Sequence, residues 1–332
     1  MEEVDSPPVV EAKEAAKAPP RDRNTPLVSI DIGKRPARTV GKPAKATKLL
    51  TLLALNPVEF YDRVRAILET KARRRWPTTA RYSPVAWEEV VKQVGEVFRP
   101  AETWSQEASA FLQTRRELEE RLARLEDVPF PTRFDGDPVL ARLGYFLTRV
   151  LRPQVVIETG VAFGISSGFI LAALERNGGG RLISIDLPPL GVSARVTGAI
   201  VPDRLRERWT LIRGVSTRVL PSVLRDLPPV GLFVHDSLFT QRNACEEYER
   251  VLPHLASHSA IVANRVDLSD AFALLTEEAK PAAHCTIAAE QKPGEMIGVA
   301  LFSDGPSLAG GGKLLRKPVM REVIPAYSDR MG

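Results

Sequence analysis

The fold is decided by residues 155–167, which read Val-Val-Ile-Glu-Thr-Gly-Val-Ala-Phe-Gly-Ile-Ser-Ser. The opening run is apolar and β-branched, which favours a buried strand, and small residues then form a turn into a predicted helix. The polar and small positions of this stretch are Glu158, Gly160, Ala162, Gly164, Ser166 and Ser167. A second apolar run, 182–185, ends in Asp186. Together they predict one strand–turn–helix–strand unit, whose helix either serine could cap.

Such a unit is typical of a crevice that holds an adenosine-containing ligand. Glycines let the backbone approach the ligand, and Asp186 can accept hydrogen bonds from both ribose hydroxyls. Glu158 is costly at the buried end of a strand unless it meets a cation or a donor, and the ammonium group of S-adenosylmethionine (SAM) is such a partner. We therefore predict a SAM site. Glu158 would hold the ammonium, the turn from Gly160 to Gly164 the amino-acid portion, and Asp186 the ribose.

Two other interpretations of this stretch are a dinucleotide site and a purely structural turn. A dinucleotide fingerprint requires Gly-x-Gly-x-x-Gly, but Ala162 stands at its second glycine and Ile165 at its third. The missing glycines favour SAM over a nicotinamide or flavin ligand. A nucleotide-binding oxidoreductase is accordingly the disfavoured hypothesis for function.

From about Leu140 to Phe302 the chain resembles class I SAM-dependent methyltransferases, in the branch of catechol O-methyltransferase-like and related bacterial enzymes. The segments that carry the resemblance follow the family's order and are 158–167, 180–189, 201–209, 232–237 and 261–266. The resemblance implies SAM as the cofactor, with Val215 and Ser216 beside its adenine. It also implies that His235 and Asp236 lie beside the transferred methyl group. Either could act as general base, and the alternative for this pair is capping of the next helix.

The chain departs from the resembled family on the acceptor side. Metal-dependent relatives carry an Asp-Asp or Asp-Asn pair after the fifth strand, whereas this chain has Asn264-Arg265. A guanidinium offers no lone pair to a cation, so we expect no metal site, and Arg265 could stabilise an acceptor oxyanion instead. The alternative for Arg265 is a surface ion pair with Asp267 or Asp270. The family's Gly-Asp-Ser after the third strand is here 214–216, Gly-Val-Ser, and Phe239 replaces a family histidine.

Two hypotheses for function follow from this resemblance. The first is metal-independent O-methylation of a small molecule by a SAM-dependent methyltransferase. The second is a catalytically inactive SAM-binding pseudoenzyme that acts as a partner or regulatory subunit, because the donor half keeps the family pattern while the acceptor half departs from it.

Composition limits the class of protein. The chain has 332 residues and a net charge of +5. Its hydrophobic content of 44% is ample for a sizeable core. No apolar run would span a bilayer, and the first residues lack the layout of a secretory signal. We expect a cytoplasmic protein without membrane or nucleic-acid partners. The basic run 71–75 is interpreted as the solvated end of a helix, and Cys245 and Cys285 suggest neither a disulfide nor a zinc site.

The pattern along the chain predicts an α/β fold of the Rossmann-like kind. We expect a mostly parallel sheet with helices on both faces and an antiparallel C-terminal edge hairpin, preceded by a helical region. Strands are predicted at 155–158, 182–186, 210–213, 230–235, 259–263, 283–289 and 297–302, and helices at 166–176, 217–226, 241–252 and 269–279. The predicted divisions are a disordered tail (1–48), a helical lid or assembly region that could form a homodimer (49–128), a SAM-binding domain (129–303) and a flexible tail (304–332).

Overall fold

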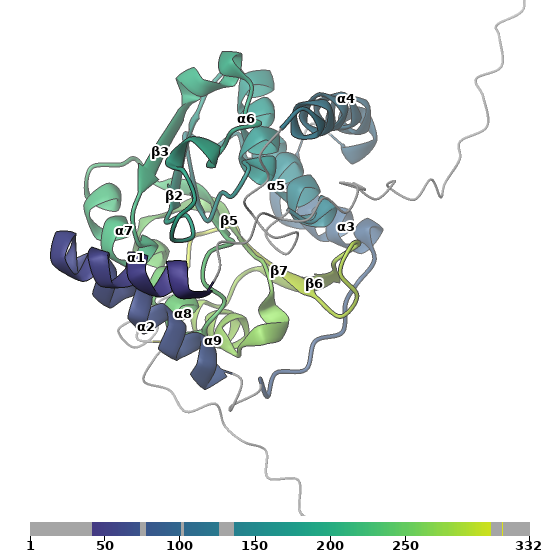
Figure 1. The fold of residues 1–332 in the computed structure, drawn as a ribbon. Coiled ribbons are helices and arrows are strands. Elements are labelled where there is room, and N and C mark those ends of the chain that lie inside the picture. Colours follow the sequence, from purple (N-terminus) through teal and green to yellow (C-terminus); the bar gives the residue numbers. More distant parts are fainter. Residues whose placement is uncertain (1–41, 74–77, 101–102, 126–135, 307–313, 315–332) are drawn as a thin grey trace, which may run out of the picture.

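The sheet at the centre of the molecule has seven strands in the order β3-β2-β1-β4-β5-β7-β6. The computed structural model describes residues 42–73, 78–100, 103–125, 136–306 and 314 (Figure 1). The strands are β1 (Val155–Thr159), β2 (Arg181–Asp186), β3 (Trp209–Arg213), β4 (Val230–His235), β5 (Leu255–Ala263), β6 (Ala283–Ala288) and β7 (Met296–Phe302). Strands β1 to β5 pair in parallel, and β7 is antiparallel to β5 and β6. The predicted fold class, including the antiparallel edge hairpin, is confirmed.

Helices cover both faces of the sheet because its strands are apolar on both sides. The helices are α1 (Lys42–Leu55), α2 (Pro57–Arg73), α3 (Trp87–Phe98), α4 (Trp104–Ala123), α5 (Pro138–Leu151), α6 (Ile165–Asn177), α7 (Ser216–Arg225), α8 (Gln241–Val251) and α9 (Ala271–Ala279). Side chains alternate along each strand, so Val156 packs with α5 and α6 while Ile157 packs with α7, α8 and α9. This alternation decides which strand residues can meet which helix.

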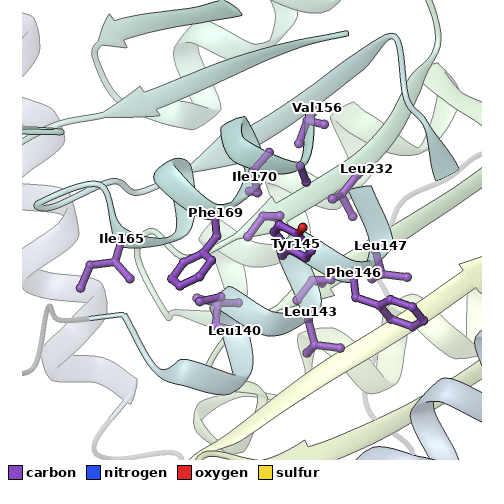
Figure 2. Close-up of a cluster of buried hydrophobic side chains, with 14 of the residues drawn as sticks. Leu140, Leu143, Tyr145, Phe146, Leu147, Val156, Ile165, Phe169, Ile170 and Leu232 are labelled. Atoms are coloured by element: carbon purple, nitrogen blue, oxygen red, sulfur yellow. The ribbon is translucent and has the colours of Figure 1, made fainter. Parts of the chain in front are cut away.

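The core on the first face forms between α5, α6 and the sheet. Figure 2 shows Tyr145, Phe146 and Phe169 from these helices gathered near Val156, and all four side chains are buried. Each large apolar side chain buried in this way contributes about 1.5–3 kcal/mol relative to full exposure. This packing fixes α6, and with it the turn that precedes α6.

Helix α5 was not among the predicted elements, although its start carries a local signature. The carboxylate of Asp137 accepts a hydrogen bond from the amide of Val139 at 2.9 Å, and Pro138 occupies the first turn. An acidic N-cap followed by proline is a common beginning of a helix. The pair Asp137-Pro138 could therefore have revealed this element.

One predicted boundary in the N-terminal part differs from the structure. Helix α1 begins at Lys42, inside the predicted tail, where Pro43 in the first turn suits a helix start. Before α3, the amide of Val85 donates to the carbonyl of Thr286 at 2.7 Å and thereby joins the sheet edge. The rest of the predicted tails, 1–41, 307–313 and 315–332, and the boundary near residue 128 lie outside the described residues.

The N-terminal helices divide between two sides of the domain. Helices α3 and α4 join the core that contains α5 and α6. Helices α1 and α2 pack together near α7 and α8 (Figure 1). The exposed large apolar side chains of these two helices include Leu50, Leu53, Leu55, Val58, Tyr61 and Leu68. Across the described ranges, no helix combines the length and apolar character that crossing a bilayer requires.

Candidate active site

A cavity of about 750 Å³ lies at the carboxyl ends of the five parallel strands. Loops that follow β1 to β5 form most of its wall, which is where ligands bind in open α/β sheets. These loops contribute Gly160, Val161, Ala162, Asp186, Leu187, Val215, Ser216, Asp236, Ser237, Leu238, Phe239, Asn264 and Arg265. Helix α2 closes another side through residues between Asp62 and Lys71. The volume is in the range of small-molecule and cofactor sites.

The turn after β1 brings two backbone segments into close contact at the cavity wall. Gly160 has φ of +86°, and a Cβ atom added to it would lie 2.1 Å from the carbonyl oxygen of Asp236. Its amide donates to the carbonyl of Ile185 at 2.9 Å. Only glycine fits such an approach, because the atoms around it belong to backbone and cannot rotate away. Glycine at this position therefore lets the turn after β1 pack directly against the loop after β4 at the cavity wall.

Asp186, for which a ribose-binding role was predicted, is a carboxylate at the cavity wall. It ends β2 at the cavity wall, and its Oδ2 atom is buried without a hydrogen-bond partner among the described residues. Burial raises the pKa of Asp186 to about 6, against the opposing effect of the backbone amides of Val161 and Leu187 and of the Thr197 hydroxyl. A buried acceptor without a partner costs free energy unless a bound group supplies a hydrogen. Two neighbouring hydroxyls, such as those of a ribose, would supply it.

Glu158 lies behind the cavity wall and not on it. Its two carboxylate oxygens accept hydrogen bonds from the hydroxyls of Ser166, Ser167 and Ser184, at 2.5, 2.5 and 2.7 Å. Burial raises the pKa of Glu158, and the three hydroxyls oppose that effect. The alternation of β1 turns Glu158 toward α6, the same side as Val156. The buried carboxylate already has donors here, so the structure does not bring it to the predicted ammonium position.

Most of the small residues that come after Glu158 in the predicted cofactor set also lie away from the cavity wall. Gly164, Ser166 and Ser167 do not line it, whereas Ala162, with φ of +49°, does. The expectation that a serine caps α6 is wrong, because the N-cap residue is Gly164 and both hydroxyls point to Glu158. Of the predicted cofactor residues, the structure brings together Gly160, Ala162, Asp186, Val215 and Ser216.

Asp236, which directly follows β4, is a second carboxylate on the cavity wall. The side-chain amide of Asn264 donates to its Oδ1 atom at 2.7 Å, and the Asn264 oxygen accepts from the amide of Arg265 at 2.9 Å. Burial raises the pKa of Asp236 to about 7, although the Asn264 hydrogen bond opposes the shift. A carboxylate with such a pKa is suited to accept a proton near neutral pH.

Arg265 lines the cavity with its charge already compensated. Its guanidinium forms ion pairs with Asp267 at 3.1 Å and with Glu295 at 2.8 Å. The predicted alternative, an ion pair with Asp267, is therefore present. Asp270 is engaged elsewhere, since its carboxylate accepts from the backbone and hydroxyl groups of residues 78–80. Within the described parts of the chain, no three His, Cys, Asp or Glu side chains converge as a metal site.

His235 does not reach the cavity wall. It is buried at the end of β4, and its Nδ1 atom lies 2.7 Å from Oε2 of Glu247 on α8. The expectation that the His-Asp pair caps the next helix is wrong, because the hydroxyl of Thr240 accepts from the amide of Asn243 at 3.3 Å and caps α8. Alternation along β4 again explains the outcome, since successive side chains point to opposite faces.

The sequence analysis did not identify two features at or behind the cavity wall. The first is Glu247, whose charged side chain is fully buried. It lies three residues after Ala244 and four before Val251, so helical periodicity places it on the buried face of α8, and this spacing was a usable signal. The second feature belongs to α2, whose contacts are with residues far away in the sequence.

Ion pairs hold α2 over the cavity. Glu59 makes two hydrogen bonds of 2.9 Å to Arg213 of β3, and Asp62 makes two, of 2.7 and 2.8 Å, to Arg218 of α7. Arg65 reaches Glu246 of α8 at 2.9 Å. Bidentate pairs between an arginine and a carboxylate fix orientation as well as distance. Helix α2 is thus a charged cover that excludes solvent from one side of the cavity.

Comparisons with known proteins concern the part of the chain that forms the central sheet. Residues 157–264 match the family described as a methyltransferase domain. The structure resembles an O-methyltransferase of Bacillus cereus in complex with S-adenosylhomocysteine (SAH), with 15% identity, a TM-score of 0.44, and coverage of 64% of this chain and 97% of the other. It resembles TomG of Streptomyces achromogenes, in complex with SAM, with 17% identity, a TM-score of 0.41 and coverages of 65% and 97%. It also resembles a methyltransferase of Podospora anserina bound to SAH, with 11% identity, a TM-score of 0.41, and coverage of 68% of this chain and 100% of the other. No curated protein matches the chain.

Proposed function

We propose that this chain, whose residues 157–264 match a methyltransferase domain, is a class I SAM-dependent methyltransferase and that it methylates an oxygen atom of a small molecule without a metal ion. The observation that carries the proposal is Asp236, a carboxylate on the cavity wall whose pKa is raised to about 7. Such a group can take the proton of a hydroxyl as its oxygen is methylated. When bound, SAM supplies a methyl group on a positively charged sulfur.

The donor half of the proposed site consists of residues that are already at the wall. Asp186 accepts hydrogen bonds from the ribose hydroxyls through its unpaired Oδ2 atom, and Val215 and Ser216 flank the adenine. The bare backbone from Gly160 to Ala162 lies against the amino-acid portion.

The acceptor half is bounded by Asp236 and by the underside of α2. Ile67, Leu238 and Phe239 add apolar surface there. Because α2 covers the cavity, an acceptor has to fit beneath it, which supports a small molecule over a protein or nucleic acid. The same cover excludes water and so strengthens the interaction between Asp236 and the acceptor hydroxyl.

Metal independence is proposed from the chemistry of the side chains around Asp236. Asn264 uses its amide nitrogen on Asp236 and its oxygen on the Arg265 amide, so neither group is directed to a cation. The guanidinium of Arg265 offers no lone pair and brings a positive charge to the place where a divalent ion would lie. A magnesium or calcium ion requires several oxygen ligands at once.

The first test of the proposal is the binding of SAM to the Asp186→Ala variant. Loss of the carboxylate removes the acceptor for two ribose hydroxyls, which costs about 1.5–3 kcal/mol, so the dissociation constant should rise at least ten-fold. Isothermal titration calorimetry measures it, with Asp203→Ala as control because the Asp203 side chain is 94% exposed. Absence of SAM binding by the unmutated chain, or tighter binding of NAD than of SAM, would contradict the proposal.

The second test addresses the metal and Arg265. Methyl transfer should survive exhaustive treatment with EDTA, and Arg265→Ala should lower turnover several-fold while the SAM dissociation constant changes little. The variant leaves Asp267 and Glu295 unpaired beside the acceptor half, and their negative charge disfavours ionised Asp236. Steady-state kinetics and calorimetry separate the two effects. Activity that EDTA abolishes and magnesium restores would refute metal independence.

A homodimer formed through the N-terminal helices is a further part of the proposal. The exposed apolar side chains of α1 and α2, among them Leu50 and Leu55, support it because such side chains gain stability from burial at an interface. Sedimentation velocity of the full chain tests it. A monomer at micromolar concentration would contradict this part alone.

A further inference from the structure

A fully buried carboxylate stands directly behind the cavity wall. Glu247 accepts hydrogen bonds from five side chains, which are Thr159 (2.8 Å), His235 (2.7 Å), Ser237 (2.7 Å), Asn243 (3.0 Å) and Ser216. Three of these donors, Ser216, Ser237 and Asn243, also line the cavity. Glu247 therefore contacts the cavity through intermediaries and never directly.

The charge state of Glu247 follows from its partners. Burial by itself raises the pKa of this carboxyl, but His235 and the hydroxyl donors together outweigh burial and hold the pKa below its usual value. An ionised carboxylate only accepts hydrogen bonds. Each hydroxyl around it must accordingly turn its hydrogen toward Glu247.

This requirement fixes what the serines can offer to a ligand. A serine hydroxyl has one hydrogen, and Ser216 gives it to Oε1 of Glu247. The Ser237 oxygen is in addition occupied, since it accepts from the side-chain amide of Asn243 at 3.1 Å. Among the described residues, the Ser216 oxygen has no such second partner. Ser216 lines the cavity, so toward a ligand there its hydroxyl oxygen can accept a hydrogen bond but has no hydrogen left to donate.

We propose that Glu247 is a positioning residue that makes the nucleobase end of the cavity selective for a hydrogen-bond donor. It does so by holding the Ser216 hydroxyl as an acceptor toward the ligand. The inference rests on the proposed function, which places the adenine beside Val215 and Ser216. A base with an amino group at position 6 satisfies this acceptor, whereas a base with a carbonyl oxygen there faces it with a second acceptor. A buried pair of acceptors is unfavourable, so the cavity rejects the 6-oxo base.

The test compares SAH with its 6-oxo analogue, S-inosylhomocysteine, by calorimetry on the full chain. The unmutated protein should bind SAH about ten-fold more tightly than the analogue. In Glu247→Gln an amide donor replaces one acceptor, so the Ser216 hydroxyl can rotate and donate. SAH binding should then weaken about ten-fold, and the ratio of the two affinities should fall toward one.

A second variant and a control keep the test decisive if Glu247→Gln folds poorly. Ser216→Ala removes the acceptor itself and should also abolish the discrimination between the two ligands. Glu107→Gln removes another buried carboxylate, one that pairs with Arg149 at 2.9 Å and does not line the cavity. It should lower the Tm and leave the affinity ratio unchanged.

The outcomes separate the inference from the proposed function. If the unmutated chain binds neither ligand, the proposed function fails. If it binds SAH but the ratio stays the same in Ser216→Ala and in folded Glu247→Gln, the positioning role of Glu247 is wrong and the proposed function stands. A ratio that also collapses in Glu107→Gln would reduce Glu247 to a general contribution to stability.

Discussion

Gly160→Ala should abolish measurable SAH binding, with a dissociation constant at least 100-fold higher than that of the unmutated chain. The added Cβ would lie 2.1 Å from the carbonyl oxygen of Asp236. The backbone at Gly160 also has φ of +86°, where a side chain costs about 1–2 kcal/mol. Relief of the contact requires the loop after β4 to move away from the turn after β1. Both loops form the cavity wall, so the ligand loses contacts to each.

Gly178→Ala separates backbone strain from the loss of the site. Gly178 has φ of +72°, yet a Cβ atom there would meet nothing within 4 Å. It ends α6 far along the helix from the cavity turn. This control should lose about 1 kcal/mol of stability and keep its affinity for SAH. Thermal unfolding and calorimetry on both variants give the comparison, and normal SAH binding by Gly160→Ala would show that the turn is not part of the site.

Asp236→Asn should lower the rate of methyl transfer by about 100- to 10,000-fold, the usual contribution of a general base. Asparagine keeps the hydrogen bond with Asn264 through its own oxygen but cannot take a proton. SAM affinity should change by less than a few-fold, because in the proposed site Asp186 and not Asp236 binds the cofactor. In the unmutated enzyme, kcat/KM should fall as the pH drops below about 7, where Asp236 becomes protonated.

The free energy of unfolding of Asp236→Asn gives a second test, which does not require a methyl acceptor. The pKa of Asp236 is raised from 3.8 to about 7 in the folded chain, so the folded state binds this proton more tightly than the unfolded state. Ionisation therefore destabilises the native protein as the pH rises from about 4 to 7. Asp236→Asn escapes this loss and should gain about 1–3 kcal/mol over the unmutated chain at pH 8 but not at pH 4. Thermal unfolding at the two values measures it.

The kinetic result also decides between an active enzyme and a binding partner. A panel of phenols, sugars and carboxylates supplies candidate acceptors for the unmutated chain. If SAM binds and none is methylated, a SAM-binding pseudoenzyme becomes the better account of the altered residues around Asn264-Arg265. If Asp236→Asn retains full turnover on an acceptor, Asp236 is not the base.

The sequence by itself determined the features that depend on neighbours along the chain. Alternating apolar strands and helices imply a parallel sheet with two covered faces, and small residues after β1 imply a tight turn whichever way the rest packs. Asp186 was predicted correctly at the cavity wall for the same reason, because a residue that ends a parallel strand must lie at the ligand-binding edge.

Only the tertiary structure decided which polar side chains face the ligand. Glu158, the last residue but one of β1, and His235, the last residue of β4, also lie at the carboxyl ends of strands. Alternation turns Glu158 toward α6 and His235 toward α8, where each hydrogen-bonds to buried side chains. The partner of His235 is Glu247, and no local pattern joins them. The cover formed by α2 depends on pairs such as Asp62 with Arg218, which are separated by more than 150 residues. The propensity to form a helix, strand or turn depends on residues close together in the sequence. Such pairings form only when the whole chain has folded.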